Sequence, residues 1–98
     1  DEAVNIKTIT IIAINDSWIE IQNKNGKIII SKILKKNENI KIDYDKELKL
    51  LAGNAGGINI EINNTVIKNL GKDGEVKRDI SLNYIDLLKF NKWAYYEY

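Results

Sequence analysis

From residue 17 to residue 34 the sequence reads SWIEIQNKNGKIIISKIL, and this stretch decides the fold class. Isoleucines in its first third alternate with other residues, as the two faces of a β-strand require. Asn25 and Gly26 then interrupt the pattern, and both residue types tolerate the positive φ angles of a two-residue type I′ turn. A second β-branched run follows the turn. We therefore predict a β-hairpin in which residues 17–24 pair with residues 27–34.

Similar short runs of β-branched or alternating apolar residues lie on both sides of this hairpin. They cover residues 6–14, 40–44, 48–52, 58–62, 66–70 and 76–82. About seven short strands at such spacing are typical of an antiparallel sandwich or a small barrel. The pattern alone does not separate the two architectures. We predict an all-β fold and favour a small antiparallel β-sandwich.

A glycine-rich break, residues 53–57, separates two of the predicted strands. It contains Gly53, Asn54, Gly56 and Gly57, so three of its five positions are glycine. Such a cluster indicates a sharp turn, a bulge or a close approach of two backbones. A phosphate-binding loop is disfavoured, because no Gly-Lys-Ser/Thr follows and a strand pattern comes next.

The C-terminal tail, residues 83–98, differs from the rest of the chain because it holds six of the eight aromatic residues. Tyr84, Leu87, Leu88 and Phe90 could form one face of a short helix. The final residues could equally form a β-strand, and the sequence leaves both possibilities open.

The composition excludes several classes of chemistry. The chain has 98 residues, which suits one domain over residues 1–98, and its net charge is +1 with basic and acidic residues interspersed. This balance disfavours nucleic acid or an anionic membrane surface as the main partner. The absence of Cys and His excludes a thiol nucleophile, a Ser-His-Asp triad and a zinc site. We predict no cofactor.

A metal site is also not predicted. Asp43, Asp45 and Glu47 are spaced like the first ligands of an EF-hand loop. However, Leu48 stands where that loop needs glycine, and Asn54 stands where it needs the closing glutamate. The three carboxylates are better interpreted as a solvated surface.

No catalytic residue is assigned. Glu20 and Glu61 could in principle supply the paired carboxylates of a glycoside hydrolase. Each occupies the outward position of an alternating strand, which is typical of a solvated sheet face. We therefore predict that the domain is not an enzyme.

Aromatic residues are the candidates for binding, namely Trp18, Trp93, Tyr95 and Tyr96. Trp18 is out of phase with the isoleucines beside it, so it either belongs to a core on the other side of its strand or is an exposed anchor. We favour the core, because Trp is highly buried on average. The tail aromatics would either cap the core or form a docking strip.

Several of these motifs together resemble one known family. The strand at residues 17–21, the Asn25-Gly26-Lys27 turn, residues 53–57 and the later Leu70-Gly71 and Gly74 loop are similar, in order and spacing, to the C-terminal domain of RodZ-like bacterial cell-shape proteins. The resemblance covers about residues 10–82. It departs in the absence of prolines, and the aromatic tail lies beyond it.

The resemblance implies a non-catalytic scaffold domain on the periplasmic side of the inner membrane. The chain starts at Asp1 and has no run of about 18 apolar residues, so we expect a fragment of a longer protein with an upstream transmembrane helix. The implied partners are cell-wall elongation proteins, and MreB through a cytoplasmic domain. The alternatives are a module that binds peptidoglycan or another glycan through surface aromatics, and an accessory domain of an enzyme.

Overall fold

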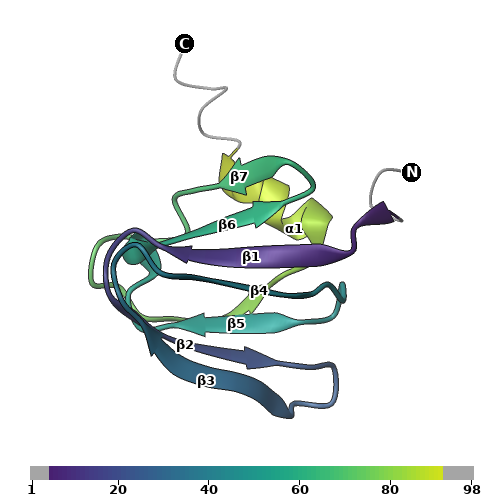
Figure 1. Ribbon diagram of the computed structural model, residues 1–98, viewed down its shortest axis with the longest axis horizontal. Coiled ribbons are helices and arrows are strands. Elements are labelled where there is room, and N and C mark those ends of the chain that lie inside the picture. The colour runs from purple at the N-terminus through teal and green to yellow at the C-terminus, as the bar shows by residue number, and fades with distance from the viewer. Residues whose placement is uncertain (1–4, 92–98) are drawn as a thin grey trace.

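The protein folds into two antiparallel β-sheets of four strands each (Figure 1), and the computed structural model describes residues 5–91. The strand orders are β4-β1-β6-β7 and β3-β2-β5-β8. The strands are β1 (Thr8–Ala13), β2 (Ser17–Gln22), β3 (Ile28–Leu34), β4 (Asn39–Asp43), β5 (Lys49–Ala52), β6 (Ile58–Ile62), β7 (Thr65–Ile67) and β8 (Lys77–Ser81). The predicted antiparallel β-sandwich is confirmed, with eight strands in the described residues rather than about seven.

Alternation along the strands builds the core between the two sheets. In the first sheet, Ile11 of β1 lies opposite Ile40 of β4 and Ile60 of β6, and both Ile11 and Ile60 are fully buried. Thr10, one position away, points to the outer face with Lys41 and Glu61 as its cross-strand neighbours. β-branched side chains suit this pleated, half-buried surface, which explains the abundance of isoleucine.

The predicted β2–β3 hairpin is confirmed, but its turn differs from the prediction. Strand pairing stops at Gln22 opposite Ile28, with a bulge, so residues 23–27 form a five-residue loop. Gly26 has a φ of +80°, whereas Asn25 does not have a positive φ, so a type I′ turn is wrong here. The Asn23 side chain shapes the loop instead, because its Oδ1 accepts hydrogen bonds from the Asn25 and Lys27 amides.

A two-residue turn with both central φ angles positive occurs in the next hairpin. Asn63 and Asn64 connect β6 to β7 with φ angles of 51° and 60°, and Ile62 pairs with Thr65 across them. Asn tolerates this left-handed geometry better than most residues.

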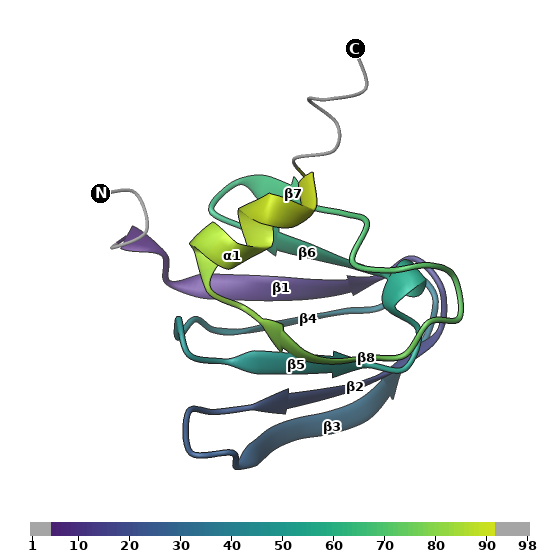
Figure 2. The same ribbon diagram turned by 180° about the vertical axis from the view of Figure 1, so that it is seen from behind.

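A short helix follows the last strand, which resolves part of the ambiguity in the tail. Helix α1 (Tyr84–Leu88) begins at Asn83, whose Oδ1 caps the Ile85 amide, and Leu87 is fully buried in the core. A 3₁₀ turn, η3 (Lys89–Asn91), continues it, and Figure 2 shows α1 in front of β6 with its end beside β7. No helix within residues 5–91 is long and apolar enough to cross a membrane.

Hydrogen bonds attach the helix and the turn to both edges of the first sheet, near β4 and β7. The Tyr44 hydroxyl, just after β4, accepts a hydrogen bond from the Tyr84 amide at 2.9 Å, and burial raises the pKa of the Tyr44 phenol. At the other end, the Asn91 side chain accepts from the Lys68 amide and donates to the Val66 carbonyl. These two contacts satisfy backbone groups at the β7 edge, which blunts that edge against pairing with another chain.

One carboxylate within α1, Asp86, makes the stability of the fold depend on pH. The Ser81 hydroxyl donates a 2.6 Å hydrogen bond to Asp86, and this bond, with Lys89 Nζ at 3.5 Å, holds the pKa of Asp86 below its ordinary value of 3.8. A lowered folded-state pKa means that this stabilisation is complete above pH 3.8 and is lost as the pH falls through the folded-state pKa.

We therefore expect the Ser81→Ala variant to be less stable than the parent at neutral pH, with a difference that shrinks below pH 3.8. Thermal unfolding from pH 7 down to about pH 2 measures this convergence. The part of the difference that persists at low pH reports the other hydrogen bond of Ser81, which accepts from the Asn83 amide. A constant difference at every pH would contradict the assignment to Asp86.

Candidate interaction surface

The carboxylates considered for catalysis lie on different sheets. Glu20 is on β2, where its Oε1 accepts a long hydrogen bond of 3.4 Å from the Trp18 indole. Glu61 is on the outer face of β6. The described residues contain no group of three or more carboxylates that could hold a metal ion. Glu20 and Glu61 therefore do not form the facing pair that glycoside hydrolysis needs.

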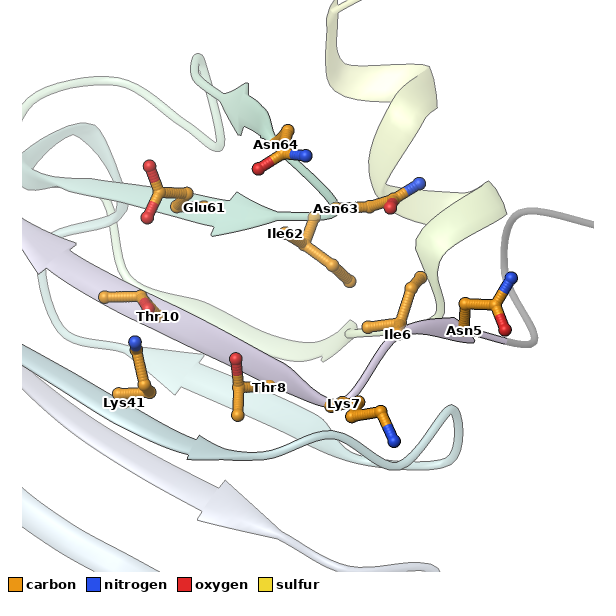
Figure 3. A pocket seen from close by; sticks show the side chains of 10 residues that line it. All are labelled: Asn5, Ile6, Lys7, Thr8, Thr10, Lys41, Glu61, Ile62, Asn63 and Asn64. Atoms are coloured by element: carbon orange, nitrogen blue, oxygen red, sulfur yellow. The ribbon is translucent and has the colours of Figure 1, made fainter.

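Glu61 lines a hollow of about 340 Å³ on the outer face of the first sheet (Figure 3). The lining residues are Asn5, Ile6, Lys7, Thr8, Thr10, Lys41, Glu61, Ile62, Asn63 and Asn64. Figure 3 shows Thr10, Lys41 and Glu61 side by side on three neighbouring strands. The hollow is open and polar with one carboxylate, so it has neither a paired acid and base nor the apolar lining typical of a small-molecule pocket.

Trp18 lies on the outer face of β2 and is 41% exposed, so the prediction that it belongs to the core is wrong. Its cross-strand partner is Ile33 of β3, which is 52% exposed. The core side of β2 is instead filled by Ile19 and Ile21, both fully buried. Trp18 and Ile33 thus form an apolar pair that faces solvent.

A surface hollow of about 360 Å³ lies beside this pair. It is lined by Asp16, Ser17, Trp18, Ile33, Lys35, Gly53 and Asn54. Gly53 is hydrogen-bonded to Trp18 through its amide and the Trp18 carbonyl at 2.8 Å. A Cβ on Gly53 would meet the Trp18 Cβ at 3.2 Å, so glycine leaves one flank of the tryptophan open.

The remaining residues of the glycine-rich break fix the loops that frame this hollow. Asn54 donates its amide to Ser17 Oγ at 3.0 Å and accepts from the Gly74 amide at 2.7 Å. Gly56, in the 3₁₀ turn η2 (Ala55–Gly57), approaches the backbone of residues 72–73 so closely that a Cβ would come within 2.5 Å of it. Gly57 accepts from the Ile14 amide at 2.8 Å.

The exposed isoleucines of β3 were not among the predicted binding residues. Ile28, Ile29 and Ile33 are 48%, 46% and 52% exposed. The available signal was the run of three isoleucines at positions 28–30, since alternation cannot bury three consecutive side chains on one face. Trp93, Tyr95 and Tyr96 lie outside the described residues.

A comparison with protein families matches the RodZ C-terminal domain to residues 10–78, which are 69 of the 98 residues. The chain belongs to this family. The matched part of this RodZ-like domain begins in β1 and ends in β8, so it contains Trp18, Ile33 and the whole glycine-rich break. Neither a curated protein nor a solved structure matches the chain.

Exposure of Trp18 in the RodZ-like domain leads to a direct prediction. We expect the Trp18→Ala variant to lose less than about 1 kcal/mol in the free energy of unfolding, because only cross-strand contacts on the outer face are removed. Chemical denaturation measures this loss. A loss of about 3 kcal/mol or more would indicate a buried indole and contradict the placement.

Acrylamide quenching gives a second, independent measurement. In a Trp93→Phe background, Trp18 is the remaining tryptophan of the chain, and its emission is expected to be quenched readily in the folded protein. A shielded indole would remove the basis for an interaction surface at this position.

Proposed function

We propose that this chain is a non-catalytic interaction domain of a RodZ-like protein, which acts as a scaffold in bacterial cell-shape maintenance and wall elongation. Family membership supports the biological setting, since residues 10–78 match the RodZ C-terminal domain. The observation that carries an interaction role is the solvent-facing pair of Trp18 and Ile33 beside an open hollow. Exposed Trp and large aliphatic side chains at one place are typical of protein contact sites.

The proposal includes a position on the periplasmic side of the inner membrane, on an upstream transmembrane helix. Its partners there would be wall-elongation proteins, while a cytoplasmic domain of the full-length protein would contact MreB. Determining the complete reading frame tests the topology. We expect an apolar stretch of about 20 residues, with a basic flank on its cytoplasmic side.

The interaction role is tested with the full-length protein in its own host. Cross-linking followed by affinity purification is expected to recover wall-elongation proteins with the parent and to lose them with the Trp18→Ala, Ile33→Ser double variant. The matched control is Ile85→Ser, because Ile85 is 57% exposed like Ile33 but lies on α1. Equal loss with the control, or no loss with the double variant, would remove Trp18 and Ile33 from the interface.

Exposure of Trp18 also favours a second candidate, a module that binds peptidoglycan by stacking on its sugars. Co-sedimentation of the domain with insoluble peptidoglycan separates the two functions. The scaffold proposal expects the domain to stay in the supernatant. Sedimentation that Trp18→Ala abolishes and Ile33→Ser preserves would favour the glycan-binding function instead.

A further inference from the structure

Strand β3 is exposed to an unusual degree for a strand this rich in isoleucine. Among the described residues it pairs with β2 alone, so one edge of its backbone is free of ladder hydrogen bonds. Only Leu34 of its seven residues is buried. Figures 1 and 2 both show β3 at the extreme edge of the molecule, on the opposite side from β7.

The two faces of β3 differ in chemistry. The outer face of β3 carries Ser31 and Ile33. Their cross-strand partners on β2 are Glu20 and Trp18, respectively. Lys32 lies on the other face, opposite the buried Ile19, and yet is exposed. The edge therefore presents an apolar side and a basic side to any strand that aligns with it.

Strand β3 and the residues that directly flank it in sequence carry only positive charge. Residues 24–36 contain five lysines and no Asp or Glu, although the whole chain has 15 basic and 14 acidic residues. The lysines are Lys24, Lys27, Lys32, Lys35 and Lys36, and none forms an ion pair with a described carboxylate. Such a local excess of positive charge attracts a partner of negative charge.

Two simple occupants of the edge are disfavoured by the same observations. Pairing of β3 with β3 of a second copy would bring two sets of five lysines together, and like charges across strands are destabilising. A bilayer would cover the isoleucines but would leave the free N–H and C=O groups of β3 without partners in hydrocarbon. An added strand satisfies these backbone groups.

We infer that β3 is the docking edge for an acidic, extended segment of a partner protein, which adds to the sheet beside β3 as a fifth strand. The segment alternates apolar side chains, which pack beside Ile33 on the face that also carries Trp18, with Asp or Glu side chains, which lie near Lys32. Strand addition of this kind takes affinity from the backbone ladder and specificity from alternate side chains. The inference rests on the proposed interaction function and deepens it by naming the partner chemistry.

The test is an NMR titration of the labelled full chain with a capped synthetic peptide that alternates Glu and Val over about nine residues. We expect amide shifts concentrated in β3, and binding that weakens as salt is added. A peptide of the same sequence with a methyl group on every backbone nitrogen has no ladder donors, and it is expected not to bind. Equal binding of the methylated peptide would reduce the contact to charge attraction and overturn strand addition.

The positive charge of the edge is tested by reversing Lys32 on the basic side and Lys35, which lines the hollow beside Trp18 and Ile33. The Lys32→Glu, Lys35→Glu double variant is expected to bind the peptide at least about tenfold more weakly, because two favourable charge contacts become repulsive. The matched control is Lys68→Glu, Lys72→Glu, which has the same net charge change at exposed positions away from β3. All four side chains are exposed, so unchanged melting temperatures are expected to show that both variants fold.

Three results would overturn the inference. One is the absence of β3 shifts at millimolar peptide. Another is dimerisation through β3 in the concentrated protein. The third is a protein that does not bind the peptide but binds vesicles of phosphatidylcholine and phosphatidylglycerol, with vesicle binding lost when Lys32 is replaced. Failure here is distinguishable from failure of the scaffold role, because cross-linking in cells would still recover wall-elongation proteins with the Lys32→Glu, Lys35→Glu variant.

Discussion

The Gly56→Ala variant is expected to lose about 2–4 kcal/mol in the free energy of unfolding, because the added methyl group has no space. Its Cβ would lie 2.5 Å from the Asp73 nitrogen and 2.6 Å from the Lys72 carbonyl oxygen, which are backbone atoms. The loop must therefore move, and the hydrogen bond from the Gly56 amide to the Lys72 carbonyl must stretch or break. Chemical denaturation of the two proteins measures the loss.

Gly53→Ala is the matched control for this prediction, since it is the same substitution in the same glycine-rich break. Neither glycine has a positive φ, so backbone strain does not distinguish the two sites. The Cβ at residue 53 would meet the Trp18 Cβ at 3.2 Å, where a shift of a few tenths of an ångström is enough. We expect a loss below about 1 kcal/mol. Similar losses at both sites would show that the close backbone approach does not control stability.

The local pattern of apolar and polar residues was sufficient to predict much of the fold. The alternation at residues 58–62 correctly predicts a half-buried strand, because three isoleucines with a period of two can all reach one side of a sheet. The interruption at Asn25 and Gly26 correctly predicts a hairpin. Both features depend on neighbours in sequence, so they can be recognised without knowledge of the tertiary structure.

The exposed surface could not be predicted in the same way, because it depends on which strand lies at the edge. A period of two places Trp18 and Ile19 on opposite faces of β2. It does not reveal that the face with Trp18 is left open to solvent by the described residues. β3 looks like a core strand in sequence, but it is an edge strand and only Leu34 of its side chains is buried. The predicted type I′ turn at Asn25 and Gly26 was wrong because a bulge between Ile21 and Gln22 lengthens the loop, and the alternation of residue types does not reveal a bulge.

Position in the sandwich, rather than residue type, should therefore set the cost of removing an isoleucine side chain. Ile60 is fully buried in β6, between Ile11 of β1 and Ile67 of β7. We expect the Ile60→Ala variant to lose about 3–4 kcal/mol in the free energy of unfolding, from lost burial and from the cavity left behind. For a domain of this size, that corresponds to a melting temperature lower by roughly 12–30 °C. Calorimetry or thermal circular dichroism measures the shift.

The matched control is Ile33→Ala, which makes the same change on a β-strand at a position that is 52% exposed. It should cost less than about 1 kcal/mol, since most of the side chain is already in contact with water. If Ile33→Ala proved as costly as Ile60→Ala, Ile33 would be part of the core and β3 would not be an open edge. If the Ile33→Ala protein is folded and stable, its binding to a partner can be interpreted directly. Weaker binding by this variant would then reflect a lost contact and not a lost fold.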